Sequence, residues 1–190
     1  MAQDSTELQY VGDGDILVAP YGTALPDTLG DALDPAFRNL GYASTDGVTD
    51  SSEPEVSDTE AWQSDLPIRR RVTKRTRGIA ATLLQTNREN YALAFGGGSW
   101  AETAPEEYEY TPPADTDDLP EYSVIVEIYD GDVHDRVILK RATMTEAIEV
   151  QHVRNEAAQY PLKFDALRPE GEDSAWKFQS NNPDHAPEGS

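Results

Sequence analysis

Apolar and polar side chains alternate with a period of two through much of the second half of the chain. Every second position is apolar at residues 122–128, 160–167 and 176–178, and at 148–153 Ile148, Val150 and His152 alternate with Glu149, Gln151 and Val153. Successive side chains of a β-strand point to opposite faces, so this period predicts strands. Strands with one apolar and one wet face favour an antiparallel β-sandwich or barrel.

Turn and helix signals divide the rest of the chain. Residues 130–132 (Asp-Gly-Asp) form a tight turn between 122–128 and a second strand at 133–139, which predicts a β-hairpin. Thr86 or Asn87 can cap a short helix that runs to about Phe95. Glycines at 96–98 end this helix. Short apolar runs predict three more strands, at 15–20, 37–42 and 79–84.

The length of the chain bounds its organisation. A chain of 190 residues can bury one good core, so we expect a single β domain over 1–180, with Phe37 and Leu40 packing inward. Residues 181–190 have the composition of a disordered tail. The chain has no cysteine, which excludes disulfides and thiolate chemistry.

Neither a membrane span nor a secretion signal is predicted. No run of about 18 apolar residues occurs, as a membrane-spanning helix would require. Residues 1–10 are polar and acidic, and they lack the basic and apolar regions of a signal peptide. We therefore expect the chain to be made in the cytoplasm and kept there until a larger assembly takes it up.

Acidic residues dominate the charge and gather in two segments. The chain has 36 acids and 15 bases, a net charge of −21, which argues against binding to polyanionic DNA. Residues 43–67 contain little apolar material and are expected to form a long loop. Within it Trp62 is an isolated aromatic residue that requires a pocket elsewhere. Residues 102–121, rich in acid and proline, are expected to be loop with a short strand around Tyr108.

A basic run of six residues without an acid follows the first of these segments. Its members are Arg69, Arg70, Arg71, Lys74, Arg75 and Arg77. Three interpretations stay open: a solvated strand, a nucleic-acid site, or a contact with an acidic surface. We favour an acidic surface on the next subunit, since a monomer has no evident need for this cluster. Strand alternation predicts one face with Arg69, Arg71, Arg75 and Arg77, and another with Arg70 and Lys74.

Motifs for catalysis, cofactors or metals are not found in the sequence. His134, His152 and His185 are not spaced as metal ligands. The glycines at 96–98 lack the Lys of a phosphate loop, and no acidic segment has the twelve-residue pattern of a calcium loop. We expect no catalytic, cofactor-binding or metal-binding residue, and a protein that is not an enzyme.

The order of several soft motifs resembles the major tail tube proteins of long-tailed, siphovirus-like viruses of bacteria or archaea. Residues 16–24 are similar to the opening strand and turn of that family. Residues 40–49, Leu-Gly-Tyr followed by Asp-Gly-Val, are similar to the segment before its long loop. Trp62, the basic run and residues 83–87 continue the order. The resemblance covers residues 14–98 well and the rest by pattern.

This resemblance implies a tail-tube β-sandwich or barrel with one flanking helix. Six subunits would form a ring, rings would stack into the virion tail tube, and the loop at 43–67 would contact the neighbouring ring. The partners implied are further copies of the chain, a tape-measure protein in the lumen, and terminator and distal tail proteins at the ends. DNA would pass without binding, which suits an acidic lumen.

Two other classes of function remain open at this point. One is another virion protein of similar build, such as a tail terminator, a head–tail joining protein or a relative from a secretion tube. The other is an acidic binding protein of the cytoplasm that mimics DNA.

Overall fold

The computed structural model describes residue 9 and residues 11–114, 118–146, 148–150, 152–154 and 157–186. Within these residues the chain is mainly β, with one α-helix and a short 3-10 turn. The elements in chain order are β1 (Asp13–Pro20), β2 (Arg38–Asn39), β3 (Ala43–Ala61), β4 (Ser64–Leu83), α1 (Arg88–Ala94), β5 (Ser99–Ala104), β6 (Glu107–Thr111), β7 (Glu121–Asp130), β8 (Val133–Thr143), β9 (Tyr160–Ala166), β10 (Trp176–Ser180) and η2 (Pro183–His185).

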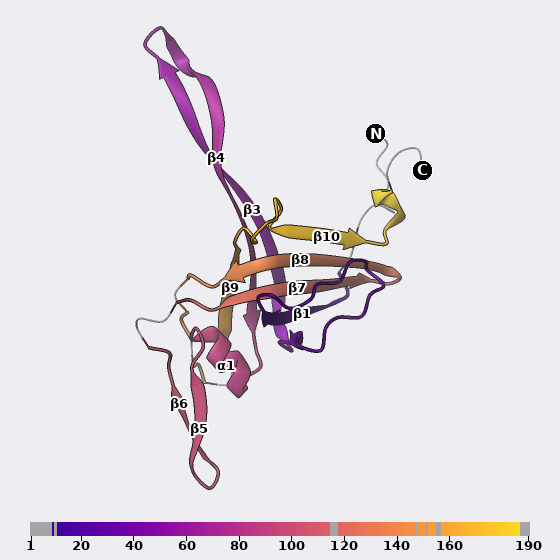
Figure 1. The fold of residues 1–190 in the computed structure, drawn as a ribbon, viewed down its shortest axis with the longest axis vertical. Helices are drawn as coiled ribbons and strands as arrows, with labels where there is room; N and C mark the ends of the chain where they lie inside the picture. The colour runs from indigo at the N-terminus through magenta and orange to yellow at the C-terminus, as the bar shows by residue number, and fades with distance from the viewer. Residues whose placement is uncertain are drawn as a thin grey trace.

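One antiparallel sheet forms the body of the protein. Its strand order is β2-β1-β7-β8-β9-β4-β3, and β10 also pairs with β8. The start of β8 pairs with β10, whereas its end, at Ala142 and Thr143, pairs with β9. The sheet turns at this point, so that β1, β7, β8 and β10 run across β3, β4 and β9 (Figure 1). The hairpin of β5 and β6 forms a separate two-stranded sheet.

The main core lies between these two parts of the sheet. The alternating apolar residues of β1, β7 and β8 point toward those of β4 and β9, and α1 adds its own apolar face. Each such side chain contributes about 1.5–3 kcal/mol when it is fully buried. The residues involved include Ile16, Val18, Val124, Val126, Val137, Leu139, Ile79, Leu83, Leu162, Phe164 and Leu93.

The opposite face of β1, β7 and β8 is also buried, so the expectation of a wet face is wrong for these strands. The segment between β1 and β2, which includes Phe37, folds over that face and covers Ile125 and Ile138. Further along the same face, the buried Arg136 guanidinium donates to the Glu127 carboxylate at 2.7 Å and to the Thr28 carbonyl at 3.2 Å. The loop therefore satisfies a buried charge as well as covering apolar surface.

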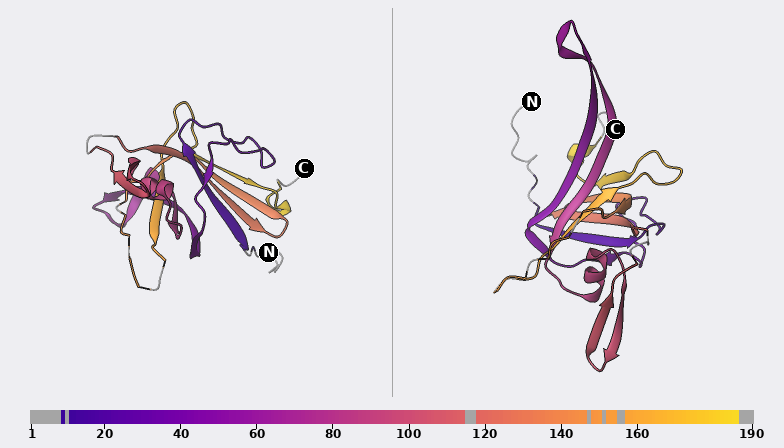
Figure 2. Two further views of the ribbon diagram at one scale, coloured as in Figure 1. Left: turned by 90° about the horizontal axis from the view of Figure 1, so that it is seen from below. Right: turned by 90° about the vertical axis from the view of Figure 1, so that its left-hand side faces the viewer.

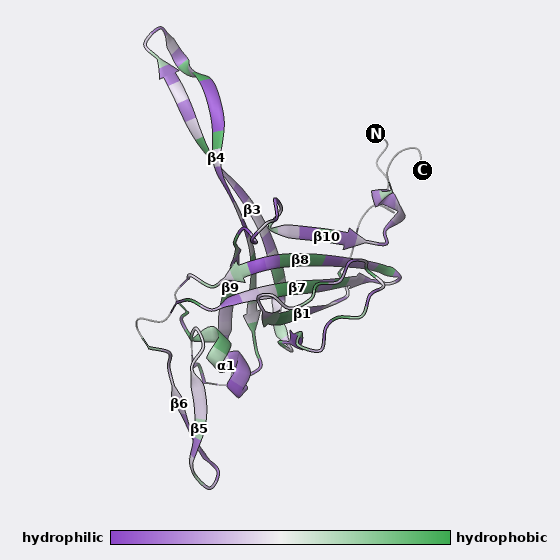
Figure 3. Cartoon of the chain, in the orientation of Figure 1, coloured by the Kyte–Doolittle hydropathy of each residue, from purple (hydrophilic) through white to green (hydrophobic). Residues whose placement is uncertain are grey.

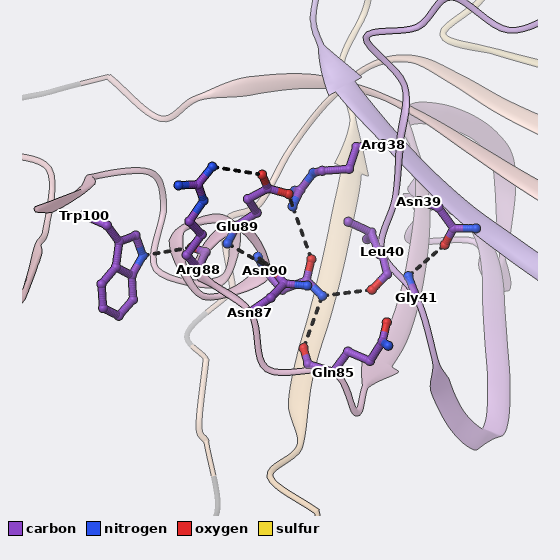
Figure 4. A network of polar contacts seen from close by, with 10 residues as sticks. All are labelled: Arg38, Asn39, Leu40, Gly41, Gln85, Asn87, Arg88, Glu89, Asn90 and Trp100. Carbon is purple, nitrogen blue, oxygen red and sulfur yellow. Dashed lines mark hydrogen bonds and ion pairs between the residues drawn. The ribbon is translucent and has the colours of Figure 1, made fainter. Parts of the chain in front are cut away.

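Helix α1 is fixed to the body by a polar network, shown in Figure 4. The Asn87 side chain caps the helix by accepting from the N–H groups of Glu89 and Asn90, as one of the two predicted caps does. The buried Asn90 amide donates to the carbonyls of Leu40 and Gln85, at 2.8 and 3.2 Å. Two loops that are far apart in sequence are thereby tied to one helical side chain.

Gly41 explains why the predicted strand at 37–42 is wrong beyond β2. Its φ of +82° turns the backbone out of the sheet, and a Cβ there would lie 1.3 Å from the side-chain oxygen of Gln85. That oxygen accepts from the N–H of Tyr42 at 3.2 Å. Glycine is therefore required twice, for the conformation and for the space. Leu40 and Phe37 are nevertheless buried, as predicted.

Two further sequence expectations need correction in the second half. The alternation at 148–153 is not a strand where the structure describes it, at 148–150 and 152–153. Ile148 and Val150 pack against the core from irregular backbone instead. The expected disordered tail at 181–190 is ordered over 181–186, because the Asn181 side chain bonds the backbone of His134 and Asp132. Residues 187–190 lie outside the described part of the chain.

The remaining predicted elements are confirmed. Strand β1, the β7–β8 hairpin with its turn at 131–132, and strands β9 and β10 occur where the sequence indicates them. The segment 102–121 was expected to be loop apart from a strand near Tyr108, and β6 confirms that strand. Strand β5, which pairs with it, was not predicted.

A candidate subunit interface on the β3–β4 hairpin

Strands β3 and β4 extend far beyond the core as a two-stranded arm, here defined as residues 49–77. The ladder between β4 and β9 ends at the pair Gly78 and Asp165, and beyond it β4 pairs with β3 alone. The eleven residues from Ser51 to Ala61 therefore project by about 30 Å at the rise of a β-strand. Figure 1 shows the arm leaving the body along the long axis of the molecule.

Residues 43–67 therefore do not form the expected loop, because nearly all of them belong to β3 and β4. Strand β3 contains no fully buried residue, and β4 is buried only from Gly78 onward. The two strands satisfy each other's backbone groups, so they need no core to be regular. The absence of core-forming residues is thus explained by a strand pair that stands in solvent.

The tip of the arm carries apolar side chains that the body does not cover. Trp62, at the turn, is 98% exposed, and Leu66 and Ile68 are 75% and 62% exposed. Most of the arm is hydrophilic (Figure 3), so these side chains stand out from their surroundings. Trp62 therefore fills no pocket among the described residues of its own chain.

Ion pairs within the hairpin hold three of the six bases. Arg70 donates two hydrogen bonds to Asp58, at 2.7 and 2.8 Å, directly across the ladder. Lys74 reaches Glu55 at 3.4 Å, again directly opposite. The hydrogen bond from Arg70 lowers the pKa of Asp58 and raises that of Arg70 itself. These cross-strand pairs stabilise a hairpin that would be marginal alone.

A third pair fixes the base of the arm. Arg77 contacts Asp50 at 2.5 Å, and its guanidinium lies 4.0 Å from the ring centre of Trp176 on β10. Burial raises the pKa of Asp50, and the nearby charge of Arg77 opposes that shift. The cation–π contact links the arm to an otherwise distant strand. Sequence analysis missed Asp50 and Trp176, because nothing local marks them as partners.

A β-bulge at Thr73 overturns the predicted division of the basic run between two faces. Val72 pairs with Val56 and Lys74 pairs with Glu55, so Thr73 is an extra residue in β4. Directly opposed residues share a face, and the bulge shifts the alternation by one position. The face with Arg69 and Arg71 therefore continues through Lys74, whereas the other face holds Arg70, Arg75 and Arg77.

Three arginines of the basic run remain without a salt bridge to any residue that the structure describes, namely Arg69, Arg71 and Arg75. Arg69 and Arg71 stand opposite Thr59 and Ser57, and together they line one shallow polar groove. The arm as a whole contains six acids and six bases, so the net charge of −21 lies outside it. The arm is thus a charge-balanced rod with free guanidinium groups near its tip.

The described part of the chain gives little support for metal binding or for chemistry at its histidines. No group of three or more His, Asp or Glu residues there could hold a metal ion. His134 contacts the buried Glu127 at 2.5 Å and stacks on Tyr129, while His152 is exposed on irregular backbone. No helix among these residues has the length and hydropathy needed to cross a membrane.

A β body that extends a long, exposed and charge-balanced arm defines a class of protein, the structural subunit that assembles with other chains. The chain belongs to the phage tail tube protein family, whose model matches residues 1–189. It is therefore a structural component of the tail of a phage-like particle. The family resemblance drawn from the sequence is confirmed.

Comparison with solved structures returns chains of gene transfer agent (GTA) particles. One belongs to the virion of a native particle, with 15% identity and a TM-score of 0.42, and the match covers 94% of this chain and 99% of that chain. A second belongs to the tail of an empty GTA particle with C6 symmetry, with 15% identity, a TM-score of 0.37 and the same coverage. No curated protein matches the sequence.

Proposed function

We propose that this chain polymerises as stacked rings of six subunits that form the tail tube, and that its role is structural and not enzymatic. The observation that carries the proposal is the arm. It orders twenty-nine residues, 49–77, outside any core, and it exposes Trp62 together with unpaired arginines. Such a structure has no use in a monomer, whereas it can reach a subunit of the neighbouring ring.

Closure of the ring is supported by an open sheet edge. Strand β2 pairs with β1 only at Leu17 and Val18, so among the described residues most of the outer edge of β1 has no strand partner. An unpaired edge offers backbone donors and acceptors to another chain. Six heterologous contacts of this kind close into a ring.

The charge distribution suits a conduit for DNA. The body carries the whole net charge of −21, because the arm is balanced. A lumen lined by this body repels the phosphate backbone, so DNA passes without being held. A tape-measure protein would occupy the lumen before DNA, and terminator and distal tail proteins would close the ends of the tube.

Removal of the arm tests the proposal. Residues 53–76 would be replaced by Asn-Gly, which forms a tight two-residue turn between Ser52 and Arg77. We expect this variant to fold as the wild type does by circular dichroism, and to lose the tubes that electron microscopy shows for the wild type. Unchanged tubes would contradict the role of the arm. Wild-type protein that forms only single rings would indicate a tail terminator, and a wild-type monomer that inhibits a DNA-binding protein would indicate a DNA mimic.

A further inference from the structure

An aromatic groove lies between α1 and the β5–β6 hairpin. Its volume is about 670 Å³, and its walls include Tyr91, Trp100 and Tyr108, with Arg88 and Glu102 beside them. The Trp100 indole donates to the Arg88 carbonyl at 2.9 Å (Figure 4), and the Trp100 and Tyr91 rings meet edge to face at 5.3 Å. The walls are therefore fixed, while Tyr108 is 65% exposed beside the groove.

The hairpin that forms one wall of this groove is acidic throughout. Between residues 99 and 114 there is no Lys or Arg, and none of the four glutamates there takes part in a salt bridge within the described residues. These glutamates are Glu102, Glu106, Glu107 and Glu109. The groove thus combines stacking surface for an aromatic ring with free negative charge.

The arm lies at the opposite end of the molecule and, although charge-balanced as a whole, carries arginines without a salt bridge near its tip. Figures 1 and 2 show the β3–β4 arm and the β5–β6 hairpin projecting in opposite directions along the long axis. The arm presents an exposed Trp62 and the unpaired Arg69 and Arg71. Complementary surfaces at opposite ends of one chain produce head-to-tail contacts, which extend without limit.

We propose that the arm tip of one subunit docks in this aromatic groove on a second copy, in the next ring of the tube. Trp62 stacks among Tyr91, Trp100 and Tyr108, and Arg69 and Arg71 face the glutamates of the β5–β6 hairpin. The aromatic contact supplies buried apolar area, and the charges set the orientation of docking. This inference rests on the proposed tube-forming function and identifies the surface that receives the arm.

Paired charge reversals test the contact. One variant carries Arg69→Glu and Arg71→Glu in the arm, and the other carries Glu102→Lys and Glu107→Lys in the β5–β6 hairpin, where Glu102 lines the groove. Each variant alone opposes like charges at every contact between rings. We expect the concentration needed for polymer formation, measured by light scattering, to rise at least about tenfold in each, which corresponds to about 1.4 kcal/mol per contact.

A mixture of the two variants is the decisive measurement. In the mixture an acidic arm meets a basic groove, and a basic arm meets an acidic groove, so polymerisation should return. A matched control, Arg154→Glu with Arg168→Glu, changes the net charge as the arm variant does but on exposed residues outside both surfaces. It should polymerise like the wild type.

The outcomes separate this inference from the function on which it rests. Wild-type protein that forms no polymer would contradict the tube-forming function itself. Wild-type polymer with unchanged assembly of both reversal variants, or a mixture that stays as inactive as its components, would overturn the docking surface and leave the tube intact.

Discussion

Replacement of Phe164 by Ala measures the contribution of the core that supports the arm. Phe164 is 2% exposed, lies on β9 opposite Ile79 of β4, and meets Tyr122 of β7 edge to face at 6.3 Å. A buried phenyl group removes about 150 Å² from water, worth about 4 kcal/mol at about 25 cal/mol per Å². Alanine retains a small part of this, and loss of the ring pair adds about 1 kcal/mol. We expect a total cost of about 3–5 kcal/mol.

Urea unfolding of the monomer, followed by circular dichroism, checks this value. The arm-deleted variant serves as the background, so that polymerisation does not compete with unfolding. Phe178→Ala is the matched control, because Phe178 is 43% exposed on β10 and its ring contacts His185 at the surface. It should cost about 1 kcal/mol or less. A cost for Phe164→Ala no larger than that of the control would remove β9 from the core and refute the packing described above.

Three further predictions concern the turn, a charged pair and salt. Gly41→Ala should cost at least about 1–2 kcal/mol, because alanine resists positive φ and meets the Gln85 side chain, whereas Gly30→Ala, in open space, should be neutral in the same urea assay. Arg141 donates two hydrogen bonds to Glu121, which lower the pKa of that carboxyl below its ordinary value of 4.5. The pair therefore stabilises the fold above pH 4.5 and loses this effect as pH falls through the lowered pKa. The difference in free energy of unfolding between the wild type and Glu121→Gln should shrink from about pH 6 to pH 3. A difference that stays constant over this range would contradict the prediction. The amount of polymer, measured by light scattering, should increase with salt concentration. Subunits with a net charge of −21 repel one another, and the Debye length falls from about 10 Å at 0.1 M to about 3 Å at 1 M. Polymer that dissolves when salt is added would show that attractive ion pairs between subunits dominate.

Much of the body could be predicted because burial leaves a pattern in the sequence. Strands β1, β7, β8 and β9 each place an apolar face against a core or a covering segment, and the period of two follows from that. Strand β10 shows the same alternation, although its Trp176 and Phe178 are 39% and 43% exposed. Helix α1 is short, but its Asn87 cap and terminal glycines mark its ends. The packing of the segment before β2 against Ile125 is a tertiary contact, and no local sequence pattern predicts it.

The arm could not be predicted as a hairpin, because it buries nothing. A two-stranded ribbon in solvent needs no apolar period, so residues 43–61 look like loop. A signal did exist in the opposed charges, since acids such as Asp58 and Glu55 precede bases at the spacing that places Arg70 and Lys74 opposite them. The bulge at Thr73, which sets the faces of the basic run, has no such signal.

The receiving groove shows the same division between local and tertiary information. A strand at Tyr108 was predicted from alternation, whereas Trp100 was not connected with it. The position of the Trp100 ring depends on a hydrogen bond from its indole N–H to the Arg88 carbonyl on the preceding helix. Interfaces built from several loops and hairpins become visible only when the fold has brought them together.

The central claim is that the chain assembles into a tube of stacked six-membered rings. Cryo-electron microscopy of the purified wild-type chain, at high protein concentration and at a salt concentration that favours polymer, tests it most directly. The account predicts hollow tubes of stacked rings, six subunits in each end-on average, with the tip of every β3–β4 arm seated on a subunit of the neighbouring ring. A chain that stays monomeric at every salt concentration, or that closes into single rings without stacking, would contradict it.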